Sequence, residues 1–230
     1  MSNHNFENPS EGDWEDRGEL SWNEFDWKHF LERHEAEISR FSELYEVHRS
    51  DINHLDTIAH LMEWDSNDWA SSEDSMEDDE EDDDDDDSAD LDETDPYTLH
   101  RHPVYIVTRA LFGHLRQLWE RYWDNNHPHV PSRLIWDYAT QLTHSEINMI
   151  LGVHALDMGD YALCVTQLKI ALASYNKLFT TLNQIGDQQS VPGASFLEDS
   201  RFRLFDLREL CLRLMADCRE EMKHPGRDLD

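Results

Sequence analysis

A block of acidic residues near the middle of the chain does most to limit how this chain can fold. It includes six consecutive aspartates, and residues 73–95 hold 17 Asp and Glu but no Lys or Arg. Neighbouring like charges repel one another, and so few apolar side chains cannot offset the entropy lost on ordering. We therefore expect residues 66–98 to form a disordered acidic linker between two helical parts. The six aspartates are Asp82, Asp83, Asp84, Asp85, Asp86 and Asp87.

The negative charge is concentrated in the first 95 residues. Of the net charge of −32 on 230 residues, −13 falls in residues 1–72, −17 in residues 73–95 and −2 in residues 96–230. An acidic field repels phosphate backbones and anionic lipids, because nucleic-acid binding relies on clustered Lys and Arg. We expect the partner to be another protein with a basic surface, with divalent cations as the other natural counter-charge, and not a nucleic acid or a membrane.

The acidic run has three interpretations. It could be a solvated spacer that keeps the molecule soluble, or it could bind basic protein segments as acidic chaperones do. It could also fold back and mask five arginines of the last predicted helix, which are Arg201, Arg203, Arg208, Arg213 and Arg219. The sequence leaves all three open.

The apolar spacing before the linker is helical. Ser21 and Glu24 have the spacing of a capping box. A heptad seam follows and predicts one long helix, or two in line, over residues 21–65, with a break allowed near Ser50–Asp51. Residues 1–20 are polar and are expected to be disordered. The seam consists of Ile38, Phe41, Tyr45, His48, Ile52, Leu55, Ala59 and Met62.

Four further helices are predicted in residues 99–224, and they form one domain. They run from about Pro103 to Asn126, 131–157, 161–186 and 197–222. Almost no segment combines β-branched alternation with turn signals, so no strands are expected. The predicted fold class is all-α: a helical bundle or helical-hairpin domain, with a long N-terminal helix and a disordered acidic connector. The inward stripes of the last two helices are Tyr161, Cys164, Leu168, Ala171, Tyr175, Leu178 and Leu182, and Leu204, Leu207, Cys211, Leu214 and Cys218.

Residues 145–178 resemble a single tetratricopeptide-type helical hairpin. Leu151-Gly152 sits where that family has its Leu-Gly pair, Gly159-Asp160-Tyr161 matches the turn, and Cys164, Leu168 and Ala171-Leu172 complete the pattern. Asn148, Ala155 and Asn176 depart from it, and only one such unit occurs, whereas about three neighbours normally share a core. The resemblance implies a surface that holds other proteins.

The sequence contains no pattern that predicts catalysis or a metal site. His100 with His102 and His127 with His129 flank opposite ends of one predicted helix, so they cannot supply a four-ligand zinc site together. The one Glu-x-x-His pair is at Glu221, near the end of the chain, whereas a di-iron bundle needs two such pairs. The three cysteines lie on apolar stripes, and Gly-rich phosphate loops are missing. We expect a non-enzymatic protein with no cofactor and no metal.

Several tryptophans lie among the acidic residues of the first half of the chain. Trp14 and Trp69 are predicted to anchor a partner while the acids, including Asp82–Asp87, steer it. For Trp22, Trp27 and Trp64 we expect packing of the long helix onto the bundle instead.

The predicted function is a protein-binding or adaptor role, using a groove between residues 132–185 and 197–222 together with the acidic segment. The alternatives are an acidic nucleic-acid mimic or a chaperone for a basic protein, and a metal-dependent helical enzyme. The amino terminus lacks a basic start and an apolar run, and no apolar stretch is long enough to span a bilayer. We expect a cytoplasmic protein with reduced cysteines, and the sequence leaves its oligomeric state open.

Overall fold

The computed structural model describes residues 22–64, 98–126, 129–187 and 193–223. Over these residues the chain is all-α and contains no strand, which confirms the predicted all-α class. The predicted disordered segments, residues 1–20 and the acidic linker 66–98 up to residue 97, lie outside the described residues. The elements are α1 (Glu24–His48), α2 (His54–Leu61), the short 3-10 helix η2 (Leu99–Arg101), α3 (Pro103–Asn126), α4 (Ser132–Asp157), α5 (Tyr161–Gly186) and α6 (Ala194–Lys223).

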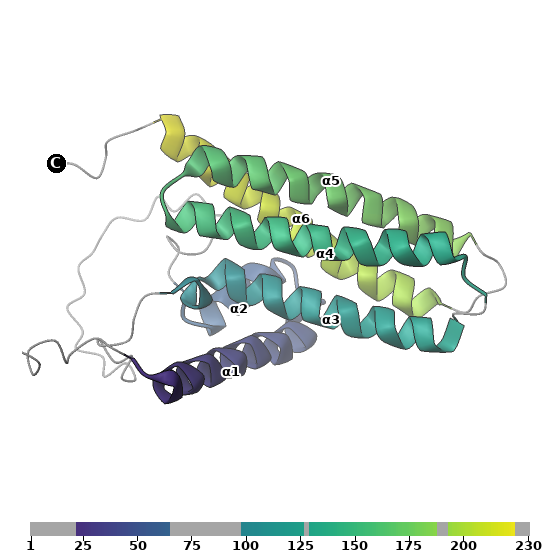
Figure 1. Ribbon diagram of the computed structural model, residues 1–230, viewed down its shortest axis with the longest axis horizontal. Coiled ribbons are helices and arrows are strands. Elements are labelled where there is room, and N and C mark those ends of the chain that lie inside the picture. Colours follow the sequence, from purple (N-terminus) through teal and green to yellow (C-terminus); the bar gives the residue numbers. More distant parts are fainter. Residues whose placement is uncertain (1–21, 65–97, 127–128, 188–192, 224–230) are drawn as a thin grey trace, which may run out of the picture.

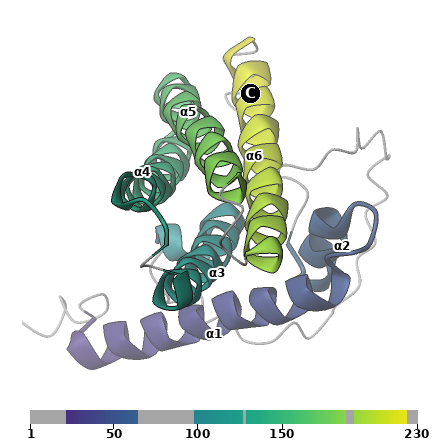
Figure 2. The same ribbon diagram turned by 90° about the vertical axis from the view of Figure 1, so that its right-hand side faces the viewer.

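Helices α3, α4, α5 and α6 form a bundle, and α1 crosses its α3 side (Figures 1 and 2). The α4–α5 hairpin lies on the opposite side of the molecule from α1 (Figure 2). Helix α2 lies beside α1 and α6, so the amino-terminal helices share one hydrophobic core with the bundle.

Helix α1 begins two residues later than the capping pattern predicted. Asn23 is the N-cap, and its side chain accepts hydrogen bonds from the amides of Phe25 and Asp26. The Asp26 carboxylate accepts from the Asn23 amide at 2.9 Å, which completes the capping box. Asn23 and Asp26 thus hold the roles predicted for Ser21 and Glu24.

The expected seam over residues 21–65 is divided between two helices that are not in line. Asn53 has a positive φ of 59°, and the chain turns back so that the Arg40 guanidinium donates to the Leu61 carbonyl at 2.9 Å. Ile52, predicted to lie on the seam, is 91% exposed in the connection. The 3-4 spacing is the same for one helix and for two helices that each bury a stripe, so it could not reveal the reversal.

The α4–α5 junction is built by small residues and a cap. Gly159 has a φ of 73°, which favours glycine, and the Asp160 carboxylate caps α5 by accepting from the Leu163 amide at 2.9 Å. A Cβ on Gly152 would lie 2.9 Å from Leu168 Cδ2, so this glycine lets α4 and α5 approach closely. Helices α4 and α5 therefore form a helical hairpin that turns at Gly159 and Asp160.

The predicted inward stripes of α5 and α6 are buried, except that Tyr161 is half-buried. All three cysteines are in the core. Trp22 and Trp27 pack edge-on against the buried Phe30, with ring centroids 5.3 and 5.7 Å away, and Trp64 stacks on Phe41 at 5.9 Å. In these contacts Trp22 and Trp27 pack on α1 itself and Trp64 packs the end of the α2 segment on α1, whereas the prediction placed all three against the bundle.

Candidate functional site

The residues predicted to bind a partner lie outside the described part of the chain. They are Trp14, Trp69 and the aspartates Asp82, Asp83, Asp84, Asp85, Asp86 and Asp87. The candidate surfaces that follow come from residues 22–64, 98–126, 129–187 and 193–223.

Helix α4 exposes an apolar stripe. Trp136 is 72% exposed, and Ile147, Leu151 and Met158 follow it at 48%, 45% and 59%. Their separations of 11, 4 and 7 residues are close to whole helical turns, so the first three lie on one side of α4, and Met158, the C-cap of α4, follows them. Residues of this size repeated on one exposed side are typical of a binding surface.

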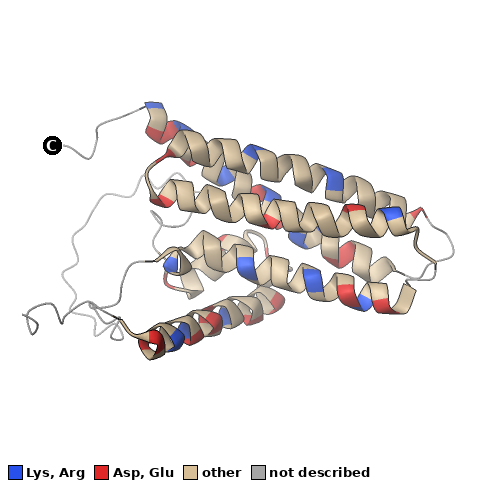
Figure 3. Cartoon of the chain, viewed as in Figure 1, with Lys and Arg blue, Asp and Glu red and all other residues tan. Residues whose placement is uncertain are grey.

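Helix α5, the other arm of the hairpin, adds two exposed apolar residues. Leu163 and Ile170 are exposed and seven residues apart, and α5 contains two lysines but no Asp or Glu (Figure 3). We call the exposed residues Trp136, Ile147, Leu151, Met158, Leu163 and Ile170 the hairpin face. It contrasts with α1, where exposed carboxylates alternate with basic residues along the whole helix (Figure 3).

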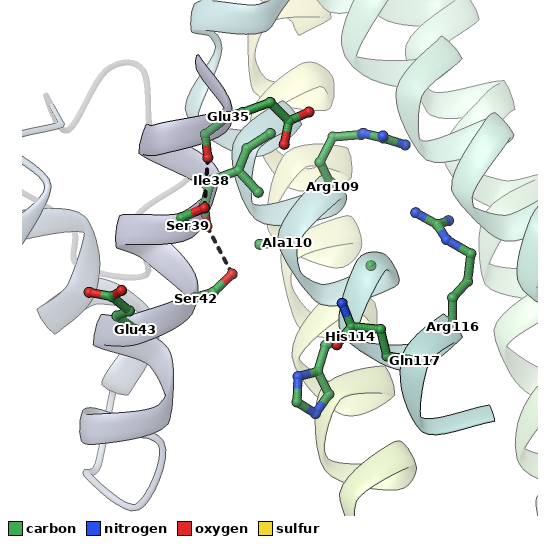
Figure 4. A pocket seen from close by; sticks show the side chains of 11 residues that line it. Glu35, Ile38, Ser39, Ser42, Glu43, Arg109, Ala110, His114, Arg116 and Gln117 are labelled. Atoms are coloured by element: carbon green, nitrogen blue, oxygen red, sulfur yellow. Dashed lines mark hydrogen bonds between the residues drawn. The ribbon is translucent and has the colours of Figure 1, made fainter. Parts of the chain in front are cut away.

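A polar cleft of about 450 Å³ separates α1 from α3 (Figure 4). Glu35 and Glu43 line its α1 wall, and Arg109 and Arg116 line its α3 wall. Ser39 and Ser42 also border the cleft, but their hydroxyls donate to carbonyls one helical turn back, at 2.8 Å each. These hydroxyls are occupied by the helix itself, so they are poor candidates for nucleophiles.

Both arginines of the cleft bind one buried carboxylate. Glu146 on α4 is 7% exposed and accepts from Arg109 Nη1 at 2.8 Å and from Arg116 Nη1. In Figure 4 the Arg109 guanidinium extends away from α1, and the Arg116 guanidinium turns toward that of Arg109. The pair therefore ties α3 to α4.

A second ionic cluster ties α1 to α6 around Arg203, whose side chain is 1% exposed. Arg203 Nη1 donates to Asp199 Oδ1 at 2.8 Å, and Nη2 donates to Glu46. Arg49 contacts the same two acids, with its Nη2 2.8 Å from Asp199 Oδ1. His114 lies 3.9 Å from Glu46 and 3.8 Å from Asp199. Burial and the charge of Arg203 lower the pKa of His114.

Asp206 is the centre of a smaller polar group between α1, α2 and α6. It is 5% exposed, and its Oδ2 accepts from the Tyr45 hydroxyl and lies 3.0 Å from His54 Nε2. Burial and the nearby charge of Asp206 raise the pKa of Tyr45. Burial lowers the pKa of His54, but the hydrogen bond and charge of Asp206 outweigh this effect and raise it.

Three of the five arginines that the acidic run was suggested to mask have partners on the described helices. Arg203 is buried in its cluster, Arg213 pairs with Asp56 and Glu209, and Arg201 donates to Asn183 at 2.8 Å. These contacts weigh against masking of Arg203 and Arg213, because both cations are already neutralised.

The described cavities do not coincide with the predicted groove between residues 132–185 and 197–222. Helix α5 packs directly on α6, with the rings of Phe179 and Phe205 4.7 Å apart. A cavity of about 760 Å³ lies between the end of α3 and the start of α6, lined by Tyr122 and Phe196 among others. Another, of about 290 Å³, lies between α1 and Trp64. We therefore place the candidate protein-binding surface on the hairpin face.

Two further observations concern metals and membranes. Among the described residues, no three His, Cys, Asp or Glu side chains are grouped so that they could hold a metal ion. None of the helices in the same residues is both long enough and apolar enough to span a membrane.

We did not predict from the sequence that three charged residues, Arg203, Asp206 and Glu146, are buried and bind partners on other helices. Each is a charged residue beside apolar positions that face inward: Arg203 and Asp206 precede Leu207 by four residues and one, and Glu146 follows Leu142 by four. A charge at such a position is the signal that could have revealed them, because a buried charge requires a partner.

Comparison with known proteins identifies no relative. No family model matches the chain, and neither the curated proteins nor the solved structures include a significant match.

Proposed function

We propose that this protein binds another protein without catalysis, through the hairpin face, and that its acidic half favours partners with basic side chains around an apolar contact. The observation that carries the proposal is the stripe of Trp136, Ile147, Leu151 and Met158, exposed on a helix that has only two exposed acids, Asp137 and Asp157. Large apolar side chains in the centre and charges at the rim are typical of protein interfaces.

Charge supports the choice of partner. The chain has a net charge of −32, so a basic protein is attracted over several ångströms before contact. The residues of the hairpin face are uncharged, so a partner can cover them without burying an unpaired carboxylate. The acids would speed association, and the apolar stripe would slow dissociation.

The test is affinity purification from native cell extract with three full-length variants. Ile147→Ser with Leu151→Ser removes the centre of the stripe, and both side chains are about half exposed, so the fold should persist. Val47→Ser is the matched control, because Val47 is 73% exposed on α1, away from the hairpin face. The third variant changes Asp82–Asp87 to Asn at unchanged length.

We expect the double variant to lose, at every salt concentration, a basic protein that wild type and Val47→Ser retain. The Asn variant should lose part of the same protein at low salt, where charges are least screened. Equal capture by the double variant and wild type would contradict the role of the hairpin face. If only the Asn variant loses the protein, binding depends on charge alone, as in a nucleic-acid mimic or an acidic chaperone.

A further inference from the structure

Two of the three cysteines meet across the α5–α6 interface. Cys164 Sγ and Cys218 Sγ are 3.5 Å apart and share a hydrogen bond. Both residues are almost fully buried, at 0% and 1% exposure. The third cysteine, Cys211, is buried elsewhere on α6, where its thiol donates to the Leu168 carbonyl at 3.4 Å. The structure therefore contains one thiol pair and one separate thiol.

We propose that Cys164 and Cys218 form a redox-sensitive dithiol site, which hydrogen peroxide or a similar two-electron oxidant converts into an intramolecular disulfide. The inference does not depend on the proposed protein-binding function. A disulfide needs sulfurs about 2.0 Å apart, so the two side chains must approach by about 1.5 Å. Side-chain rotation and a small shift at the ends of the two helices can supply this movement.

The reaction balances with one peroxide for each pair. The Cys218 thiolate attacks a peroxide oxygen, the O–O bond breaks, and a sulfenic acid and one water form once the leaving hydroxide is protonated. Cys164 then attacks the sulfenic sulfur, the S–S bond forms, and the S–O bond breaks to release the second water. Two thiols are oxidised and one peroxide is reduced to two waters.

The positions of the cysteines in their helices and the pKa values of Cys218 and Cys211 both favour oxidation of this pair over oxidation of Cys211. Cys164 is in the first turn of α5, and Cys218 is near the end of α6, where fraying exposes side chains at lower cost than global unfolding. The hydrogen bond to Cys164 lowers the pKa of Cys218, and it raises the pKa of Cys164. Burial raises the pKa of Cys211 to about 12, which keeps that thiol protonated and unreactive.

A disulfide here would restrain the unfolded chain across 54 residues of sequence. A loop of this length should raise the Tm of the oxidised protein by roughly 5–15 °C over the reduced protein. The increase should be reversed by dithiothreitol.

The experiment treats the full-length protein with hydrogen peroxide, unfolds it, and counts free thiols by maleimide labelling and intact mass. We expect wild type to lose two of its three thiols and about 2 Da, and peptide mapping to link Cys164 to Cys218 within one chain. Cys211→Ser should behave in the same way, whereas Cys164→Ser and Cys218→Ser should form no intramolecular disulfide.

Three results would overturn the proposal. They are survival of all three thiols at a peroxide dose that oxidises free glutathione, a crosslink that includes Cys211, or a disulfide between two chains on a non-reducing gel. Peptide mapping of wild type decides the question even if a Ser variant does not fold.

Discussion

Replacement of Arg203 should be one of the most damaging single changes in the protein. Its side chain is 1% exposed, it binds Glu46 and Asp199, and its guanidinium carbon lies 5.3 Å from the Tyr45 ring centroid. Arg203→Ala would leave a cavity where the buried stem packs and would remove charge-assisted hydrogen bonds to both acids. We expect the free energy of unfolding to fall by about 3–5 kcal/mol, of which the cavity contributes about 2–3 kcal/mol and the lost hydrogen bonds about 1–2 kcal/mol.

The matched variant Arg203→Met separates packing from charge, because methionine refills most of the volume of the stem. Neither acid becomes a buried, unpaired charge when Arg203 is replaced. The Glu46 side chain is 46% exposed to solvent, and Asp199 remains paired with Arg49 at 2.8 Å. Arg203→Met should therefore cost only about 1–2 kcal/mol. Lys at this position would keep the charge but lose the planar fork that reaches two carboxylates.

Urea unfolding of the full-length variants, followed by far-UV circular dichroism at neutral pH, measures both changes. Hydrogen exchange of the α1 amides reports whether α1 detaches before the bundle unfolds, as expected if the cluster holds α1 on α6. A loss below about 1 kcal/mol for Arg203→Ala would refute the reasoning, since that value is typical of an exposed ion pair. Equal losses for Ala and Met would refute the division between packing and charge.

Two other changes test the polar group and the helical hairpin. The raised pKa of His54 means that its proton stabilises the folded state fully below about pH 6.5 and that this contribution is lost as pH rises through the folded pKa. The stability deficit of His54→Gln in urea unfolding should therefore be larger at pH 6 than at pH 8, and an equal deficit would contradict the contact with Asp206. Gly152→Ala should destabilise the protein by about 1–3 kcal/mol in the same assay, because the new Cβ would lie 2.9 Å from Leu168 Cδ2. The control is Gly113→Ala, which has nothing within 4 Å of the new Cβ and should stabilise the protein by about 0.5–1 kcal/mol. If both substitutions lowered the free energy of unfolding, crowding against Leu168 would not explain the loss at Gly152.

The helices were predictable because local signals mark them. Pro103 does begin α3, and the stripe that includes Leu168 and Leu178 is buried as its spacing predicted. Helix ends and buried faces depend on neighbouring residues, so the sequence contains this information. The path between α1 and α2 depends instead on one backbone conformation at Asn53, which no periodic pattern reports.

The partners of buried charges were not predictable, because they join distant segments. Arg203 and Glu46 are 157 residues apart, and Glu146 receives arginines 37 and 30 residues away. A sequence can show that Arg203 occupies an inward position, but only the packing of α1 on α6 decides which acid neutralises it. The hairpin face was also missed, because an apolar residue on α4 reads as core until the other faces are known.

The ionic clusters also bear on the proposed preference for basic partners. Arg203 and Arg49 are neutralised by Glu46 and Asp199, and Arg213 has its own acids, Asp56 and Glu209. The described helices therefore use these cations internally, and these residues offer little positive surface to the acidic segment. The 17 carboxylates of residues 73–95 must then be balanced by dissolved cations or by a partner. Displacing dissolved cations makes the binding of a basic protein more favourable at low salt, so salt dependence separates the contribution of the acids from that of the uncharged hairpin face.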